Sequence, residues 1–142
     1  MNPTDVVRAS VDTWNNADRQ GFLACYAEDC EIVTPALDGK GHDGVAAFWT
    51  SIMGPMPDCR VQVLRLLTEG DAVAEEALSQ ATNTGPSYAP DGTEIPATGR
   101  TATFAFSALH TVQDDKIVSS HFYWDTLAIL AQLGLLPDAN AG

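Results

Sequence analysis

The sequence predicts an α+β fold, in which helices cover one face of a curved, mostly antiparallel sheet. Two observations indicate this class. Apolar residues recur at helical spacing in the first part of the chain, and after Pro57 they recur at every second position, as in strands. Helices followed by a run of strands are typical of an α+β domain. A bent sheet wrapped around helices encloses a pocket, and 142 residues suit a single domain over residues 1–142.

The first helix is predicted from the residues at its start and from one apolar stripe. Asn2 can cap the helix, and Pro3 suits its first position. Val7, Val11 and Trp14 follow at a spacing that places them on one side of a helix. We therefore expect this helix to pack that side against the sheet.

The later elements are predicted from the same two periodicities and from the turn residues between them. They are a short helix over 22–27, a short strand over 31–34, a turn over 38–41, a helix over 44–53 capped by Asp43, strands over 60–68, 72–83, 100–111 and 117–124, and a helix over 126–133 ended by Gly134. Residues 85–99 hold three prolines and three glycines, so we expect a surface loop there.

Charge and composition exclude several classes of partner. The net charge is −12, and the seven Lys and Arg residues are scattered, so we expect neither nucleic acid nor an anionic membrane as a partner. No apolar run approaches the ~20 residues that span a bilayer. The N-terminal residues lack the features of a secretory signal, and the three cysteines are sparse. We therefore expect a cytoplasmic protein.

No motif predicts a metal or a nucleotide cofactor. The three histidines and three cysteines have none of the spacings typical of metal sites. Neither glycine-rich nucleotide-binding motif is present. We therefore expect neither a metal nor a cofactor.

The hairpin over 100–124 brings chemically active side chains to one face of the sheet. If Asp114 and Asp115 are its two turn residues, their position fixes which residues of the two strands lie opposite each other. The side chains of residues that lie opposite each other point to the same face of the sheet. Ionisable groups among aromatic rings lose hydration, which can give an acid/base pair that works near neutral pH. A slip of one residue would move every side chain to the other face. The face expected to line the pocket carries Phe104, Phe106, His110, His121, Tyr123 and Asp125.

Simpler explanations stay open for these side chains. Asp125 stands at a helix start and can be an N-cap alone, although capping and catalysis do not exclude each other. His110 and His121 can be ordinary sheet histidines. Glu75 and Glu76 are neighbours on a strand, so one of them must face the pocket side, where it would be an additional acid.

Six short segments, in this order and spacing, resemble the SnoaL-like polyketide cyclases, a branch of the nuclear transport factor 2-like superfamily. Together they cover essentially the whole chain. The segments are Met56-Pro57-Asp58, Thr82-Asn83-Thr84-Gly85-Pro86, Pro96-Ala97-Thr98-Gly99-Arg100, Asp114-Asp115-Lys116-Ile117-Val118, His121-Phe122-Tyr123-Trp124-Asp125 and Gln132-Leu133-Gly134-Leu135.

The resemblance implies a conical barrel: a curved, mostly antiparallel sheet packed on three N-terminal helices, with a deep pocket and a homodimer formed through the sheet. It also implies cofactor-free acid/base catalysis, with Asp125 as the general acid/base and His110 assisting. The side chains expected to bind a small hydrophobic substrate are His121, Tyr123, Phe104, Phe106, Trp14 and Trp49.

The function that this resemblance implies is an intramolecular aldol cyclisation, or a related isomerisation, of a polyketide-type or polycyclic substrate. Two alternatives remain open. One is a non-catalytic module that binds an apolar ligand in its pocket or only dimerises. The other is an isomerase or dehydratase that resembles ketosteroid isomerase. Fold alone does not decide between them.

Overall fold

The structure, a computed structural model, describes residues 1–136, and residues 137–142 of the expected domain lie outside that range. The described part is α+β, as predicted. Its elements are α1 (Pro3–Asn15), α2 (Arg19–Ala24), β1 (Tyr26–Val33), β2 (Asp38–Lys40), α3 (Gly41–Met53), β3 (Arg60–Glu69), β4 (Ala72–Thr82), β5 (Ser87–Tyr88), β6 (Glu94–Ile95), β7 (Thr101–Gln113), β8 (Lys116–Trp124) and α4 (Thr126–Leu133).

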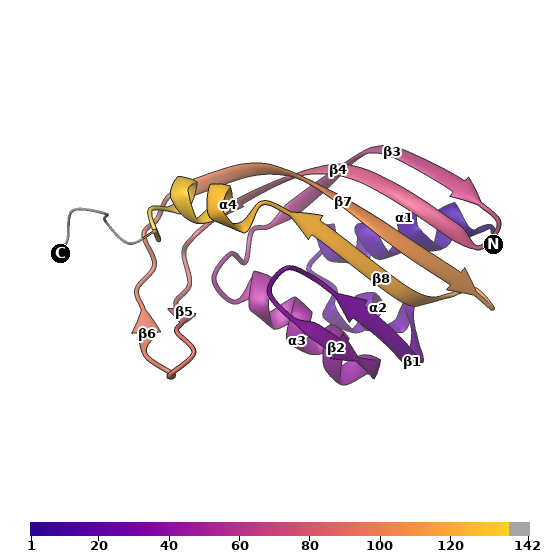
Figure 1. The fold of residues 1–142 in the computed structure, drawn as a ribbon, viewed down its shortest axis with the longest axis horizontal. Coiled ribbons are helices and arrows are strands. Elements are labelled where there is room, and N and C mark those ends of the chain that lie inside the picture. The colour runs from indigo at the N-terminus through magenta and orange to yellow at the C-terminus, as the bar shows by residue number, and fades with distance from the viewer. Residues whose placement is uncertain (137–142) are drawn as a thin grey trace.

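One curved sheet dominates the molecule. Its six strands lie in the order β2-β1-β8-β7-β4-β3, and every neighbouring pair is antiparallel except β1 and β8. The sheet is not closed. It arches over α1, α2 and α3, and α4 lies at the far end of the long strands (Figure 1). This is the predicted cone-like arrangement, with the concave side of the sheet facing the helices.

The start of α1 follows the prediction, whereas the start of α3 does not. The side chain of Asn2 accepts a hydrogen bond from the backbone N–H of Asp5 at 3.0 Å, and the Asp5 carboxylate accepts one from the Asn2 N–H at 3.4 Å. The expected cap at Asp43 is wrong. Residues 38–40 pair with β1 as a strand, so α3 begins directly after them, and a left-handed backbone at Gly41 (φ 64°) makes the turn.

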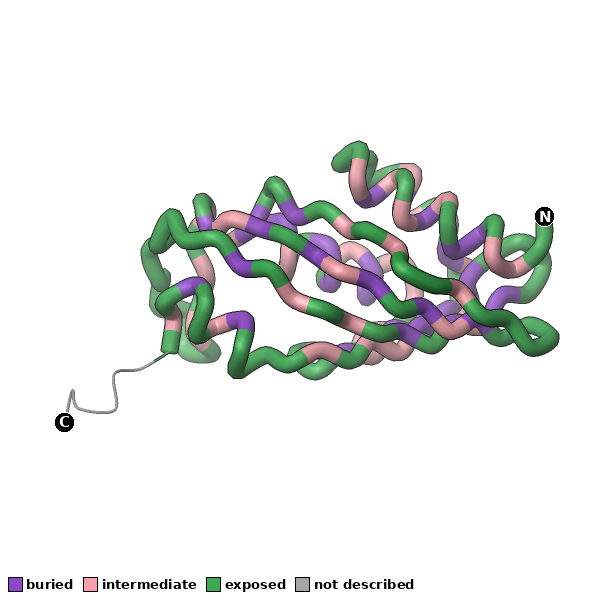
Figure 2. Tube along the Cα trace, turned by 90° about the horizontal axis from the view of Figure 1, so that it is seen from above, coloured by how far each residue is buried: buried purple, intermediate pink, exposed green. Residues whose placement is uncertain are grey.

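Burial alternates along the long strands, because one face of the sheet packs on the helices and the other does not. Figure 2 shows this alternation, which is regular along β4. Between the sheet and the helices lies an aromatic cluster around Trp14. The ring centroid of Trp14 is 5.2 Å from that of Phe22, 4.9 Å from that of Trp49 and 5.6 Å from that of Phe48. This cluster forms the floor beneath the concave face.

The β7–β8 hairpin contains the expected turn but an unexpected bulge. Asp114 and Asp115 both have positive φ (52° and 60°), as a tight two-residue turn requires. Ile117 faces Val112, but the next facing pair is Ser119 with Thr111, so Val118 is an extra residue in β8. From that point every residue of β8 faces the opposite side from the one predicted.

Candidate active site

A cavity of about 250 Å³ lies between the concave face of the sheet and helices α1, α3 and α4. Its wall is mainly aromatic and aliphatic. Of the predicted binding residues, Trp14, Phe104 and Phe106 line it, whereas Trp49 packs behind Trp14 and is not among the lining residues. Phe22, Phe48, Phe122 and Trp124 also belong to the aromatic wall.

Two ionisable side chains from neighbouring strands meet in this apolar wall. His110 on β7 and Glu75 on β4 both point to the concave side, and His110 Nε2 lies 2.8 Å from Glu75 Oε1. Both residues line the cavity, although only 3% and 4% of their surfaces are exposed. Burying a charged group so deeply is costly unless it has a partner. The predicted pocket histidine is therefore present, but its acidic partner is Glu75.

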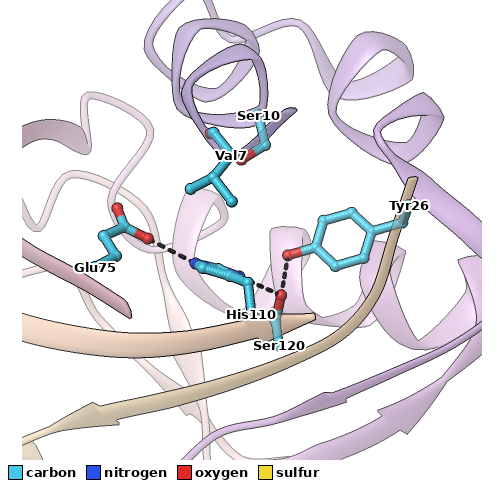
Figure 3. A network of polar contacts seen from close by, with 6 residues as sticks. All are labelled: Val7, Ser10, Tyr26, Glu75, His110 and Ser120. Atoms are coloured by element: carbon cyan, nitrogen blue, oxygen red, sulfur yellow. Dashed lines mark hydrogen bonds and ion pairs between the residues drawn. The ribbon is translucent and has the colours of Figure 1, made fainter. Parts of the chain in front are cut away.

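The polar contacts continue from His110 across two more strands (Figure 3). His110 Nδ1 lies 2.7 Å from Ser120 Oγ on β8, and that oxygen lies 2.9 Å from the hydroxyl of Tyr26 on β1. Burial raises the pKa of the Tyr26 hydroxyl well above its usual value, so Tyr26 is a neutral phenol at physiological pH. We call these four residues, Glu75, His110, Ser120 and Tyr26, the polar chain.

The predicted placement of His121 and Tyr123 in the pocket is wrong. The bulge at Val118 turns both side chains to the convex face, where 55% of Tyr123 is exposed. His121 Nε2 lies 2.9 Å from the carboxylate of Glu31 on β1, and this hydrogen bond lowers the pKa of Glu31. Their expected partner on the same face, His110, points the opposite way.

The predicted placement of Asp125 on the pocket face is also wrong. β8 ends at Trp124, whose side chain lines the cavity, and Asp125 follows as an exposed residue outside the cavity wall. Its Oδ1 accepts a hydrogen bond from the backbone N–H of Ala128 at 3.0 Å, so the N-cap interpretation is confirmed. The catalytic role that the resemblance implies for Asp125 stays a prediction, and this geometry does not favour it.

Sequence reasoning left Glu75 as a secondary candidate and missed Ser120 and Tyr26. The signal for Glu75 was present, because it interrupts an inward row of small or apolar residues on β4. Ser120 is absent from the predicted pocket face, because the simple hairpin register places it on the opposite face. Tyr26 was assigned to a helix, because β1 begins five residues earlier than its apolar alternation indicates.

The structure gives no sign of a metal centre or a membrane span in its described part. Across residues 1–136, no three His, Cys, Asp or Glu side chains come together as metal ligands would. None of the helices in that range has the length and apolar character to cross a bilayer.

Residues 7–120 match the family model described as the SnoaL-like domain. No curated protein matches the sequence. A candidate SnoaL-like polyketide cyclase from Jannaschia sp. CCS1 is 19% identical, with a TM-score of 0.81, and the match covers 95% of this chain and 93% of that one. IdmH, a candidate polyketide cyclase from Streptomyces antibioticus, is 24% identical, with a TM-score of 0.77, and the match covers 94% of this chain and 99% of that one.

A third solved structure has a different assigned chemistry. An LEH-like epoxide hydrolase of M. tuberculosis is 17% identical to the chain, with a TM-score of 0.69, and the match covers 92% of this chain and 88% of that one. At such identities these likenesses show a shared fold, and the reaction must be argued from the site.

Proposed function

Because the chain belongs to the SnoaL-like domain family, we propose that it is a cofactor-independent acid/base enzyme that acts on a small hydrophobic carbonyl compound. The observation that carries the proposal is the Glu75–His110 pair in the wall of a mainly apolar cavity. An apolar cavity with a few convergent polar groups is the usual form of a small-molecule site.

Glu75 is the proposed general base. One of its carboxylate oxygens, Oε1, is held by His110, and within residues 1–136 the other oxygen, Oε2, has no hydrogen-bond partner. Oε2 can therefore take a proton from a bound substrate while His110 holds the carboxylate in place. A positioned group of this kind contributes roughly 10²–10⁴-fold to a rate.

The proposed reaction is an intramolecular aldol cyclisation or a related isomerisation. Glu75 removes a proton from the carbon next to a carbonyl, and the resulting enol carbon attacks a second carbonyl of the same molecule. In an isomerisation the proton returns at another carbon. The aromatic wall folds the substrate so that the reacting carbons meet, and well-oriented intramolecular reactions reach effective molarities of about 10⁵ M or more. The likeness to two candidate polyketide cyclases supports this class.

We also propose that the chain forms a homodimer through the convex face of the sheet. Three neighbouring strands place Leu67, Ala74 and Leu109 directly beside one another on that face. Each of the two leucines is 56% exposed. Burying this row against a second copy would remove apolar surface from water.

The test of the catalytic proposal is proton exchange at the carbon next to a carbonyl. β-Tetralone and other apolar ketones that bind the protein are incubated in D₂O, and deuterium uptake is followed by mass spectrometry. The wild-type protein should accelerate uptake, and Glu75→Gln should lose about 10²-fold or more of that acceleration. Glu76→Gln is the matched control, because Glu76 is the neighbouring residue on the same strand and is exposed on the other face.

Thermal unfolding of both variants shows whether each still folds. If the wild-type protein binds these ketones and accelerates exchange in none of them, the proposal fails and the non-catalytic binding module becomes the better interpretation.

A further inference from the structure

We propose that the Tyr26 hydroxyl is a second catalytic group, which gives its proton to the substrate's carbonyl oxygen and regains one from His110 through Ser120. This inference rests on the proposed function, because it supplies the acid that must act opposite the base Glu75. In an aldol or enolisation step, negative charge develops on the carbonyl oxygen as the base takes the proton from carbon, so a donor at that oxygen stabilises the transition state.

The polar chain has the geometry of a proton relay. Its members stand on four strands that are neighbours in the sheet, β1, β8, β7 and β4, in the same order as the contacts. The three links measure 2.9, 2.7 and 2.8 Å, all within the usual range of hydrogen bonds. Both ends of the chain, Tyr26 and Glu75, line the cavity, while Ser120 is fully buried beneath it.

The hydrogen bonds of the relay can run in either direction, because hydroxyl and imidazole groups both donate and accept. The proposed relay starts with a carboxylate at Glu75 and with a proton on each nitrogen of His110. Nε2–H donates to Glu75 and Nδ1–H donates to Ser120, whose hydroxyl donates to the Tyr26 oxygen. Across residues 1–136, Ser120 is the sole partner of the Tyr26 hydroxyl. In this arrangement its proton is therefore left to donate to a bound substrate.

The transfer balances in protons and in charge. Glu75 Oε2 takes the proton from carbon, and the electron pair of that C–H bond forms the C=C bond of the enol. The π pair of the carbonyl moves to oxygen, which takes the Tyr26 proton. Tyr26 takes the Ser120 proton, and Ser120 takes the Nδ1 proton of His110. Glu75 and His110 end neutral, so the ion pair disappears without leaving a net charge in the cavity.

The relay explains why a buried tyrosine can act as an acid here. Desolvation makes a Tyr26 phenolate unfavourable, so Tyr26 can give up its proton only if another arrives in the same step. Ser120 supplies that proton at hydrogen-bond distance. Tyr26 is therefore the proposed acid, and Ser120 is the residue that connects it to His110.

The experiment compares Tyr26→Phe, Ser120→Ala and the double variant in the β-tetralone exchange assay. Each single variant should lower kcat about 10²-fold with little change in KM. The kcat of the double variant should be no lower than that of either single variant, because both changes interrupt the same proton path. Tyr88→Phe, the same chemical change at an exposed residue of β5, is the control and should keep the wild-type rate.

A binding measurement separates this inference from the proposed function. Para-nitrophenolate carries an oxyanion on an apolar ring, and its absorption reports binding. Tyr26→Phe should weaken its affinity about tenfold or more, as expected for a lost hydrogen bond to a charged oxygen. If the wild-type protein catalyses no exchange but this loss is seen, the proposed function fails and Tyr26 stands as the oxyanion donor.

Two results would overturn the inference while leaving the proposed function intact. One is a wild-type exchange rate in Tyr26→Phe. The other is a wild-type rate in Ser120→Ala, which would mean that no proton passes through that hydroxyl. If Tyr26→Phe does not fold, the exchange rate of Ser120→Ala alone tests the relay, because that change removes only one oxygen atom from the protein.

Discussion

Glu75 occupies an inward position of β4 between Val73 and Ala77, where a carboxylate is stable only with a partner. His110 is that partner, and the two side chains are almost fully buried. Removing His110 alone should therefore destabilise the fold as well as the site. His110→Ala is expected to lower the free energy of unfolding by about 3–5 kcal/mol, measured by urea denaturation.

The matched comparison is the double variant Glu75→Ala/His110→Ala. Its loss in free energy of unfolding should be smaller than the sum of the losses in the two single variants, because neither partner is then left alone in the core. Additive losses would mean that the two side chains contribute to stability independently.

Asp125 offers a direct comparison between capping and catalysis. Asparagine caps a helix about as well as aspartate, so Asp125→Asn should leave both the melting temperature and the exchange rate near their wild-type values. Asp125→Ala removes the hydrogen bond to Ala128 and should cost about 1 kcal/mol of stability without loss of exchange. A large loss of exchange in the folded Asp125→Asn variant would instead support the catalytic role that the family resemblance implies.

Asp58 links stability to pH. Its carboxylate accepts a hydrogen bond from the backbone N–H of Thr82 at 2.7 Å, and this bond lowers the pKa of Asp58 below its ordinary value of 3.8. The folded-state pKa is therefore below the unfolded one, so the stabilisation is present above the unfolded pKa and disappears as the pH falls through the folded one. In Asp58→Asn the melting temperature should fall less steeply below about pH 4 than in the wild-type protein. Equal slopes would contradict this account.

At the scale of elements, one bulge separates the predicted site from the observed one. The periodicities predicted α1, α4 and the four long strands nearly to their ends, because each of these carries a clear apolar pattern and turn residues beside it. The register of β8 could not be predicted, because the extra residue, Val118, lies in an uninterrupted strand sequence with no glycine to mark it. The predicted face of His110 depends only on the alternation within β7, and it is correct. The predicted placements of His121, Tyr123 and Asp125 depend on the register of β8, and they are wrong.

The register of β8 can be tested by shortening the strand. Deleting Val118 and Ser119 together would leave β8 one residue short of its present register, which exchanges Phe122 and Trp124 for His121 and Tyr123 on the concave face. Exposing two apolar side chains at about 1.5–3 kcal/mol each should lower the free energy of unfolding by about 3 kcal/mol or more. Deleting Val118 alone removes only the bulge, keeps Ser119 opposite Thr111, and should lower the free energy of unfolding far less. Similar stabilities for the two variants would contradict this account of the register.

At the scale of the whole molecule, the sheet separates two surfaces with different expected roles. Its concave face forms the cavity wall, and its convex face carries the leucine row proposed as a dimer interface. Leu109→Glu places a charge at one end of that row and should convert the dimer to a monomer in analytical ultracentrifugation. Leu127→Glu, at an exposed position on α4 that does not belong to that row, should leave the dimer intact. A monomeric wild-type protein would contradict the proposal.

The aromatic floor beneath the sheet has a practical consequence for finding a substrate. The chain has three tryptophans: Trp14 and Trp124 line the cavity, and the ring of Trp49 lies 4.9 Å from that of Trp14. Any molecule that fills the cavity therefore displaces water beside two indole rings and alters the surroundings of the third. Intrinsic fluorescence should thus act as a built-in reporter, so that compound libraries can be titrated without a label and without knowing which bond is made or broken.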